Sequence, residues 1–191
     1  MFEKLKPPIQ DEEKIRKIGE FYDRVSHANA DYFDFWKEET FLHWDFWLSC
    51  CFTFIPILIW LKMHKKESRG RLLLAGFFVV IISCWFDFLG TVWGLWYYTG
   101  KNIPTIPSYG PWDFCIFPVL VMLIIQFKPH ISPWKKGLFF AAFSCLIGEP
   151  FFWWLGFYVL TGWKMLYSFP IYFVIYLLAH KLSHLKTFEK I

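Results

Sequence analysis

Charged residues are scarce in this sequence of 191 residues: Asp, Glu, Lys and Arg together make up only 19% of it. A soluble domain usually has about 25% charged and about 45–50% apolar residues. Here the apolar share is 56%, and aromatic residues alone account for 24%. These proportions exclude a disordered chain and an ordinary soluble domain. We therefore predict an all-α fold, a polytopic bundle of membrane helices.

Three further features are missing. The net charge is only +4 and the basic residues form no stripe, which excludes a nucleic-acid-binding surface. The five cysteines show no CxxC or Cys/His ligand spacing, and His43, His130 and His184 lie at the rims of apolar segments, so we predict no metal site and no cofactor. The first 40 residues are charged and lack the apolar core of a signal peptide.

Five apolar segments are candidates for membrane spans, since about 20 helical residues cross about 30 Å of hydrocarbon. The predicted membrane domain covers residues 41–185, preceded by an N-terminal segment, 1–40, and followed by a cytoplasmic tail, 186–191. The predicted spans within it are 41–61, 72–98, 112–127, 137–160 and 166–179.

Lys and Arg alternate between the connections. Five follow the first span and three lie between the third and fourth spans, whereas the connections 99–111 and 161–165 hold one each. Basic loops stay on the cytoplasmic side of a membrane. This pattern predicts a multi-pass protein of the cell membrane, with its N-terminus outside and its C-terminus cytoplasmic.

The N-terminal segment has the pattern of an amphipathic helix. Ile15, Ile18, Tyr22 and Val25 recur at helical spacing and form one apolar face. The helix is either interfacial, lying on the membrane surface, or a solvated helix packed on the outer loops.

An internal repeat is visible at an offset of 62 residues. An acid, an aromatic residue and a glycine recur at this offset, and so does a Thr-Gly pair. The matching pairs are Asp87 and Glu149, Gly94 and Gly156, Trp96 and Tyr158, and Thr99-Gly100 and Thr161-Gly162. We predict two parallel helix-pair halves behind an extra first helix, an arrangement known in membrane proteins; chance matching in a narrow alphabet is the alternative.

Four acids lie within the predicted spans or at their ends: Asp45, Asp87, Asp113 and Glu149. An ionisable residue at depth costs roughly 2.5–3.5 kcal/mol on insertion scales, and such residues usually face the bundle interior. Two carboxyl groups close together in a low-dielectric medium do not both ionise, and a neutral carboxylic acid suits general acid catalysis or proton coupling. Asp87, Glu149 and Asp113 are therefore the candidate catalytic residues.

Structural roles for the same acids stay open. Asp113 is also a natural first-turn residue at a helix start, and Pro150, directly after Glu149, predicts a kinked helix in which Glu149 would serve the kink. Gly90 and Gly94 form a GxxxG pattern that lets a neighbouring helix approach closely.

Helical spacing gives each predicted span a stripe of small or polar residues. We expect these stripes to converge on one polar cavity, roofed by the proline-rich connection 99–111 acting as a lid. Aromatic side chains would line its wall and stabilise a cation by cation–π contact. The residues predicted to bind a ligand are Asp45, Trp93, Trp96, Tyr98, Trp153, Tyr172 and Tyr176.

The stretch from Asp87 to Gly100, followed by Pro111-Trp112-Asp113-Phe114, resembles the lycopene cyclase domain of bacterial and fungal carotenoid enzymes. The matching residues are Asp87, Gly90, Thr91, Gly94, Trp96, Tyr97, Pro111 and Asp113. The resemblance implies a bundle of repeated small helical units and chemistry on an isoprenoid. That family has paired acids after its proline, whereas this chain has only Asp113. The whole chain is similar to an uncharacterised family of small five-span bacterial membrane proteins.

Our leading hypothesis is an integral membrane protein, surrounded by the lipid bilayer, that binds a hydrophobic, isoprenoid or lipid ligand at a polar intramembrane site. Whether it is an enzyme stays open. A proton-coupled transporter or transporter subunit is the first alternative, and a non-catalytic membrane assembly or sensor subunit is the second. A homo-oligomer and a membrane partner are both compatible with the sequence.

Overall fold

The computed structural model describes residues 9–185 and divides them into two compact units, 9–41 and 42–185. The predicted cytoplasmic tail, 186–191, lies outside the described residues, as do residues 1–8 of the predicted N-terminal segment.

The first unit is one long helix, α1 (Glu12–Glu39). It begins after Asp11, whose side chain accepts a hydrogen bond of 3.0 Å from the backbone N–H of Lys14. Side-chain ion pairs one turn apart support its surface: Glu13–Lys17, Arg16–Glu20 and Asp34–Lys37. The four residues of its predicted apolar face are all exposed. The helix is as predicted, and the surface that it meets stays a prediction.

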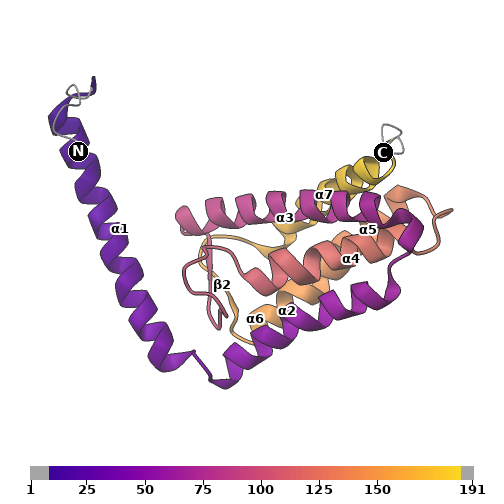
Figure 1. Ribbon diagram of the computed structural model, residues 1–191, viewed down its shortest axis with the longest axis horizontal. Coiled ribbons are helices and arrows are strands. Elements are labelled where there is room, and N and C mark those ends of the chain that lie inside the picture. Colours follow the sequence, from indigo (N-terminus) through magenta and orange to yellow (C-terminus); the bar gives the residue numbers. More distant parts are fainter. Residues whose placement is uncertain (1–8, 186–191) are drawn as a thin grey trace. The chain divides into compact units, whose positions relative to one another are not determined.

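The second unit is a helical bundle closed at one end by a two-stranded ribbon (Figure 1). Its helices are α2 (Trp44–Met63), α3 (Arg69–Val92), α4 (Phe117–Gln126), α5 (Pro133–Phe143), α6 (Glu149–Trp154) and α7 (Ser168–Ser183). Short 3₁₀ turns, η1 (Lys66–Ser68) and η4 (Met165–Tyr167), precede α3 and α7. The strands are β1 (Trp96–Tyr98) and β2 (Tyr158–Leu160).

Within residues 9–185, four helical segments are long and apolar enough to cross a membrane. They are Trp44–Met63, Lys66–Val92, Pro133–Trp154 and Met165–Ser183. A fifth apolar helix, Pro111–Gln126, is shorter. The mainly helical architecture agrees with the predicted all-α class, and the four long helices are compatible with a multi-pass membrane protein.

Among the described residues, two π-helical turns each end two positions before a proline. These turns are η2 (Pro111–Ile116), ahead of α4, and η3 (Ser144–Gly148), between α5 and α6. The backbone N–H of Phe117, before Pro118, bonds the carbonyl of Trp112, and that of Glu149, before Pro150, bonds the carbonyl of Ser144. A proline offers no N–H, and its ring clashes with the carbonyl four residues earlier, so a widened turn relieves the conflict.

The bundle is packed around one aromatic and aliphatic core. The helices α3 and α4 lie against each other, as do α5 and α7, and α7 also packs on α3. Phe117, Phe140 and Tyr176 are completely buried in this core. A second cluster, which includes Tyr109, Phe152 and Phe157, lies beneath the ribbon.

The predicted spans 72–98 and 137–160 are too long, because both helices stop at a glycine. α3 ends at Val92 and α6 at Trp154. Gly94 and Gly156 follow with φ of 66° and 79°, which an L side chain rarely adopts. In each case the residue directly after the glycine donates its backbone N–H to the carbonyl five positions earlier, Leu95 to Gly90 at 2.8 Å and Phe157 to Phe152 at 2.9 Å. This is the Schellman way of ending a helix.

The ribbon pairs β1 with β2 antiparallel, with Tyr97 opposite Val159 at its centre. The bonds beside it are reciprocal. Thr99 donates its hydroxyl to the carbonyl of Gly156 at 2.6 Å, and Thr161 donates its hydroxyl to the carbonyl of Gly94 at 2.5 Å. The bonds made by the two threonines are thus related by the same offset of 62 residues that the sequence shows.

Candidate functional site

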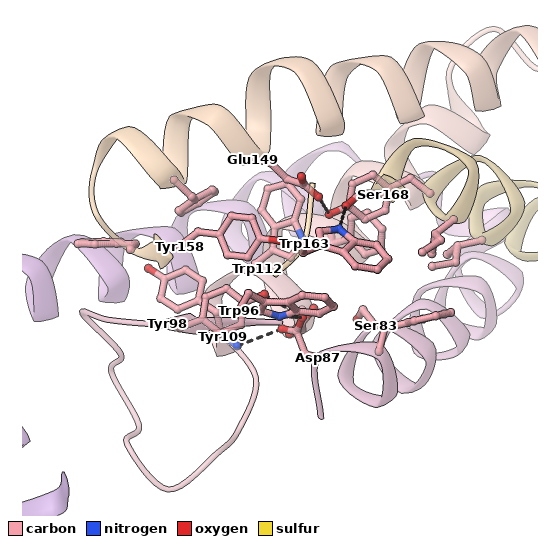
Figure 2. A pocket seen from close by; sticks show the side chains of 18 residues that line it. Ser83, Asp87, Trp96, Tyr98, Tyr109, Trp112, Glu149, Tyr158, Trp163 and Ser168 are labelled. Atoms are coloured by element: carbon pink, nitrogen blue, oxygen red, sulfur yellow. Dashed lines mark hydrogen bonds between the residues drawn. The ribbon is translucent and has the colours of Figure 1, made fainter. Parts of the chain in front are cut away.

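A cavity of about 70 Å³ lies between the helices beneath the ribbon (Figure 2). Asp87 on α3, Asp113 on η2 and Glu149 on α6 all line it. These three side chains are more than nine-tenths buried. In Figure 2, Glu149 and Asp87 lie on opposite sides of the cavity, with tryptophan rings between them. Three of the four predicted acids therefore share one site.

Asp87 accepts hydrogen bonds from the ribbon and from the connection that follows it. Its Oδ1 accepts from the hydroxyl of Tyr98 at 2.8 Å and from Nε1 of Trp96 at 3.3 Å. Its Oδ2 accepts from the backbone N–H of Tyr109 at 3.4 Å. Trp96 approaches Asp87 closely because Gly90, one turn further along α3, has no side chain: a Cβ there would lie 2.0 Å from the indole ring.

The carboxyl group of Asp113 lies within hydrogen-bonding reach of Asp87. Its Oδ2 is buried with no hydrogen-bond partner among the described residues. Two carboxyl groups in this relation are stabilised by sharing one proton, because two neighbouring negative charges repel each other strongly away from water. The pair is therefore a stereochemically suitable proton donor.

Glu149 has a different set of neighbours. Its Oε1 accepts a hydrogen bond of 2.6 Å from the hydroxyl of Tyr172. The hydroxyl of Ser168 also faces this carboxyl group, and it accepts a hydrogen bond of 3.0 Å from Nε1 of Trp163. The second oxygen, Oε2, is buried without a hydrogen-bond partner in the described part of the chain. Glu149 thus has one carboxyl oxygen left for a donor that residues 9–185 do not supply.

Aromatic rings make up most of the remaining wall. Tyr98 stacks between Tyr109 and Tyr158, with ring centroids 5.6 and 5.5 Å apart. Burial, and next the negative charge of Asp87, raises the pKa of Tyr98 well above its usual value. Burial likewise raises the pKa of Tyr158. Both hydroxyl groups consequently stay neutral at physiological pH, as a donor to a carboxyl group must.

The charges around the cavity have one sign. Its lining contains three acids and no Lys, Arg or His among the described residues. In residues 9–185, no three His, Cys, Asp or Glu side chains are grouped closely enough to hold a metal ion. Carboxyl oxygens and aromatic faces both favour a cation or a hydrogen-bond donor over an anion.

The predicted ligand-binding residues divide into two groups. Trp96, Tyr98 and Tyr172 line the cavity. The other four do not: Trp93 and Trp153 are exposed, Tyr176 is buried in the core, and Asp45 accepts the backbone N–H of Phe46 at the start of α2. The GxxxG prediction is wrong in detail, because Gly90 faces an indole ring and Gly94 terminates the helix.

The predicted lid, residues 99–111, folds back over α2. Ser49 donates to the carbonyl of Gly100 at 2.6 Å and bonds the hydroxyl of Tyr109 at 2.6 Å. The side-chain amide of Asn102 donates to the hydroxyl of Thr53 at 2.9 Å. The connection is thus held to the first long helix of the bundle, while its Tyr109 reaches the cavity wall.

Sequence reasoning missed Tyr109, Trp112 and Trp163 as lining residues. Trp112 had a usable signal, since it directly precedes Asp113 at a helix start. Tyr109 and Trp163 lie in irregular connections, where no periodicity indicates which way a side chain points.

Comparison with protein-family models, with curated proteins and with solved structures found no match to this chain.

Proposed function

We propose that the protein is an integral membrane protein that binds a hydrophobic or amphipathic molecule of the isoprenoid or lipid class in this cavity. One observation carries the proposal: Asp87, Asp113 and Glu149 come from three different helices and line one aromatic cavity. Buried acids are expensive in a membrane, so their convergence favours a role for them.

The chemistry of the lining supports a particular polar end for the ligand. A phosphate or carboxylate would meet three acids and no basic side chain in the described lining. A hydroxyl or an ammonium group would instead donate to the free Oε2 of Glu149. The aromatic faces would add cation–π attraction for an ammonium group. We therefore expect a ligand whose polar end donates hydrogen bonds.

The size of the cavity indicates how much of the ligand it holds. A buried water needs about 10–15 Å³ of such volume, so 70 Å³ accommodates a polar group and a few neighbouring atoms. A long isoprenoid or acyl tail would extend beyond the cavity into apolar surroundings. The cavity is then the recognition site for the polar end.

The test is photo-crosslinking of a diazirine-bearing prenol to the purified protein in phosphatidylcholine vesicles. We expect labelling of peptides that carry Trp96 or Trp163, which line the cavity. Glu149→Gln and Asp87→Asn should each reduce this labelling at limiting probe by about tenfold or more, since a hydrogen bond to a charged group contributes about 1.5–3 kcal/mol. Asp45→Asn is the matched control, because it makes the same change outside the cavity.

Labelling that is unchanged in both cavity variants would contradict ligand binding at the acids and would favour a structural role for them. Lipid extraction of the purified protein gives an independent answer, since a co-purifying isoprenoid or lipid supports the proposal. Proton movement into vesicles by ligand-free protein would instead support the transporter alternative.

We also infer five membrane spans, with Pro111–Gln126 as the short one, and a helix-pair repeat made of α3–α4 and α5–α7. The reciprocal threonine bonds and the central pairing of Tyr97 with Val159 support the repeat, because equivalent residues of the two halves make equivalent bonds.

For orientation we propose that the ribbon end faces outward, with the C-terminus cytoplasmic and the protein in the cell membrane. The basic α2–α3 and α4–α5 connections lie together at the end of the bundle opposite β2 (Figure 1). Basic connections on one side support a cytoplasmic position for that end. Impermeant labelling of single cysteines introduced at Thr105 and Lys135, which are both exposed, in a variant without the native cysteines, would test it.

A further inference from the structure

A second hollow lies at the basic end of the bundle, away from the acid-lined cavity. It is a groove of about 710 Å³ between the end of α2, the end of α4 and the start of α5. The side-chain amide of Gln126 closes one side of it: the amide donates to the carbonyl of Met63 at 2.9 Å and accepts from the backbone N–H of Lys65 at 3.1 Å. At this groove, the two hydrogen bonds of Gln126 therefore join α4 to the C-terminal end of α2.

The lining of this groove combines positive charge with apolar surface. Lys65, Lys128, Lys135 and Lys136 all line it, and its described lining contains no Asp or Glu. Apart from Gln126, the rest of its described lining consists of methionine, leucine, isoleucine and phenylalanine side chains. Such a surface complements an anion that is attached to an apolar group.

One buried lysine of this groove, Lys136, favours the binding of an anion. Its side chain is only 6% exposed, and its Nζ donates to the carbonyl of Ile125 at 3.0 Å. An ammonium group has three donors, and no carboxylate among the described residues lies within ion-pair distance of this one. A buried cation without a counter-ion is unfavourable, so a negative group in the groove would stabilise Lys136.

The first turn of α5 adds to the positive potential. α5 begins at Pro133, and the preceding Ser132 makes no side-chain cap. The first N–H groups of a helix and the positive end of its dipole favour anions. Lys135 and Lys136 lie in this same turn.

We propose that this groove binds the phosphate of an anionic phospholipid, such as phosphatidylglycerol, with an acyl chain along the apolar wall. The phosphate would accept hydrogen bonds from Lys136 and Lys135. The apolar wall argues for a lipid rather than a free anion, because a soluble phosphate would leave Leu123, Ile124 and Phe139 uncovered. The groove also lies at the end of the long apolar helices, where lipid headgroups would be found.

The experiment compares two double variants in nanodiscs of phosphatidylcholine that contain phosphatidylglycerol. K128Q/K135Q removes two exposed lysines that line the groove. K62Q/K66Q is the matched control, because it removes two exposed lysines near the end of α2 that do not line it. Phosphatidylglycerol retained per protein after detergent extraction is measured by mass spectrometry.

We expect wild type to retain phosphatidylglycerol in preference to phosphatidylcholine. Each groove lysine removed should weaken binding by about fivefold, while the control stays within about twofold of wild type. Lys136→Met should lose binding as well; if this buried variant does not fold, the exposed pair decides. Equal retention of both lipids, equal loss in both double variants, or displacement of the lipid by inorganic phosphate would each overturn the proposal.

Discussion

Replacing Gly90 by Ala tests the closest approach in the candidate site. A Cβ at this position would lie 2.0 Å from Cζ2 of Trp96, which is part of a rigid indole ring. The ring must move, and its 3.3 Å hydrogen bond to Asp87 is then lost. Overpacking costs about 1–3 kcal/mol, and the lost bond about 0.5–1.5 kcal/mol. Alanine in a helix returns about 0.5–1 kcal/mol, so we expect a net destabilisation of about 1–3 kcal/mol.

Unfolding by SDS in mixed micelles, followed by far-ultraviolet circular dichroism, measures this change. Gly70→Ala is the control in the same helix, because nothing lies within 4 Å of its Cβ. We expect that control to be neutral or slightly stabilising. If Gly90→Ala unfolds at the same SDS fraction as Gly70→Ala, the close packing of Trp96 on α3 is refuted.

Two further predictions concern the ribbon. Thr99→Val and Thr161→Val each remove one of the reciprocal bonds, of 2.6 and 2.5 Å, and should destabilise the protein by similar amounts, about 0.5–1.5 kcal/mol. The corresponding serine variants should retain most of the stability. Clearly unequal losses in the two valine variants would argue against equivalent halves. The pKa of Tyr98 is raised above its usual 10.0 by burial and by Asp87, so the folded protein keeps a proton that the unfolded chain loses, and stability falls as pH rises above 10.0. Tyr98→Phe should show a smaller alkaline loss in the same SDS assay, and identical alkaline slopes would contradict this.

The apolar segments of the sequence predict the helices well, because about twenty mainly apolar residues leave few alternatives to a helix in a membrane. The helix ends were harder. Gly94 and Gly156 are typical C-terminal signals, yet the apolar residues after them continue the pattern of a span. Strands of three residues are too short for a period of two to be recognised.

The sequence predicted the acidic residues of the candidate site, but only some of the aromatic residues that line the cavity. Asp87, Asp113 and Glu149 could be selected because charge is rare in apolar segments. Their aromatic neighbours could not be selected, because this chain is rich in aromatic residues and the sequence does not distinguish a ring at a membrane rim from a ring in a cavity. Trp153 and Trp163 illustrate this: Trp153 is exposed, whereas Trp163 lines the cavity. Pro150 predicts a kinked helix, and the structure has a π-helical turn just before this proline.

In the ribbon, β1 pairs antiparallel with β2, and Tyr97 lies opposite Val159 at the centre. The same edge of β1 can pair in the same antiparallel way with a second copy of β1. A fragment that stops after α4 would lack β2 and leave the backbone groups of β1 unpaired, and an unpaired strand edge recruits another chain. A second fragment presents the same unpaired edge of β1. We therefore expect two such fragments to associate as a two-fold symmetric dimer, with Tyr97 of one β1 strand opposite Tyr97 of the other. Disulfide trapping of Tyr97→Cys fragments would detect the dimer, and its absence would show that the edge is specific for β2. The chain of 191 residues avoids this association by carrying its own partner strand, β2.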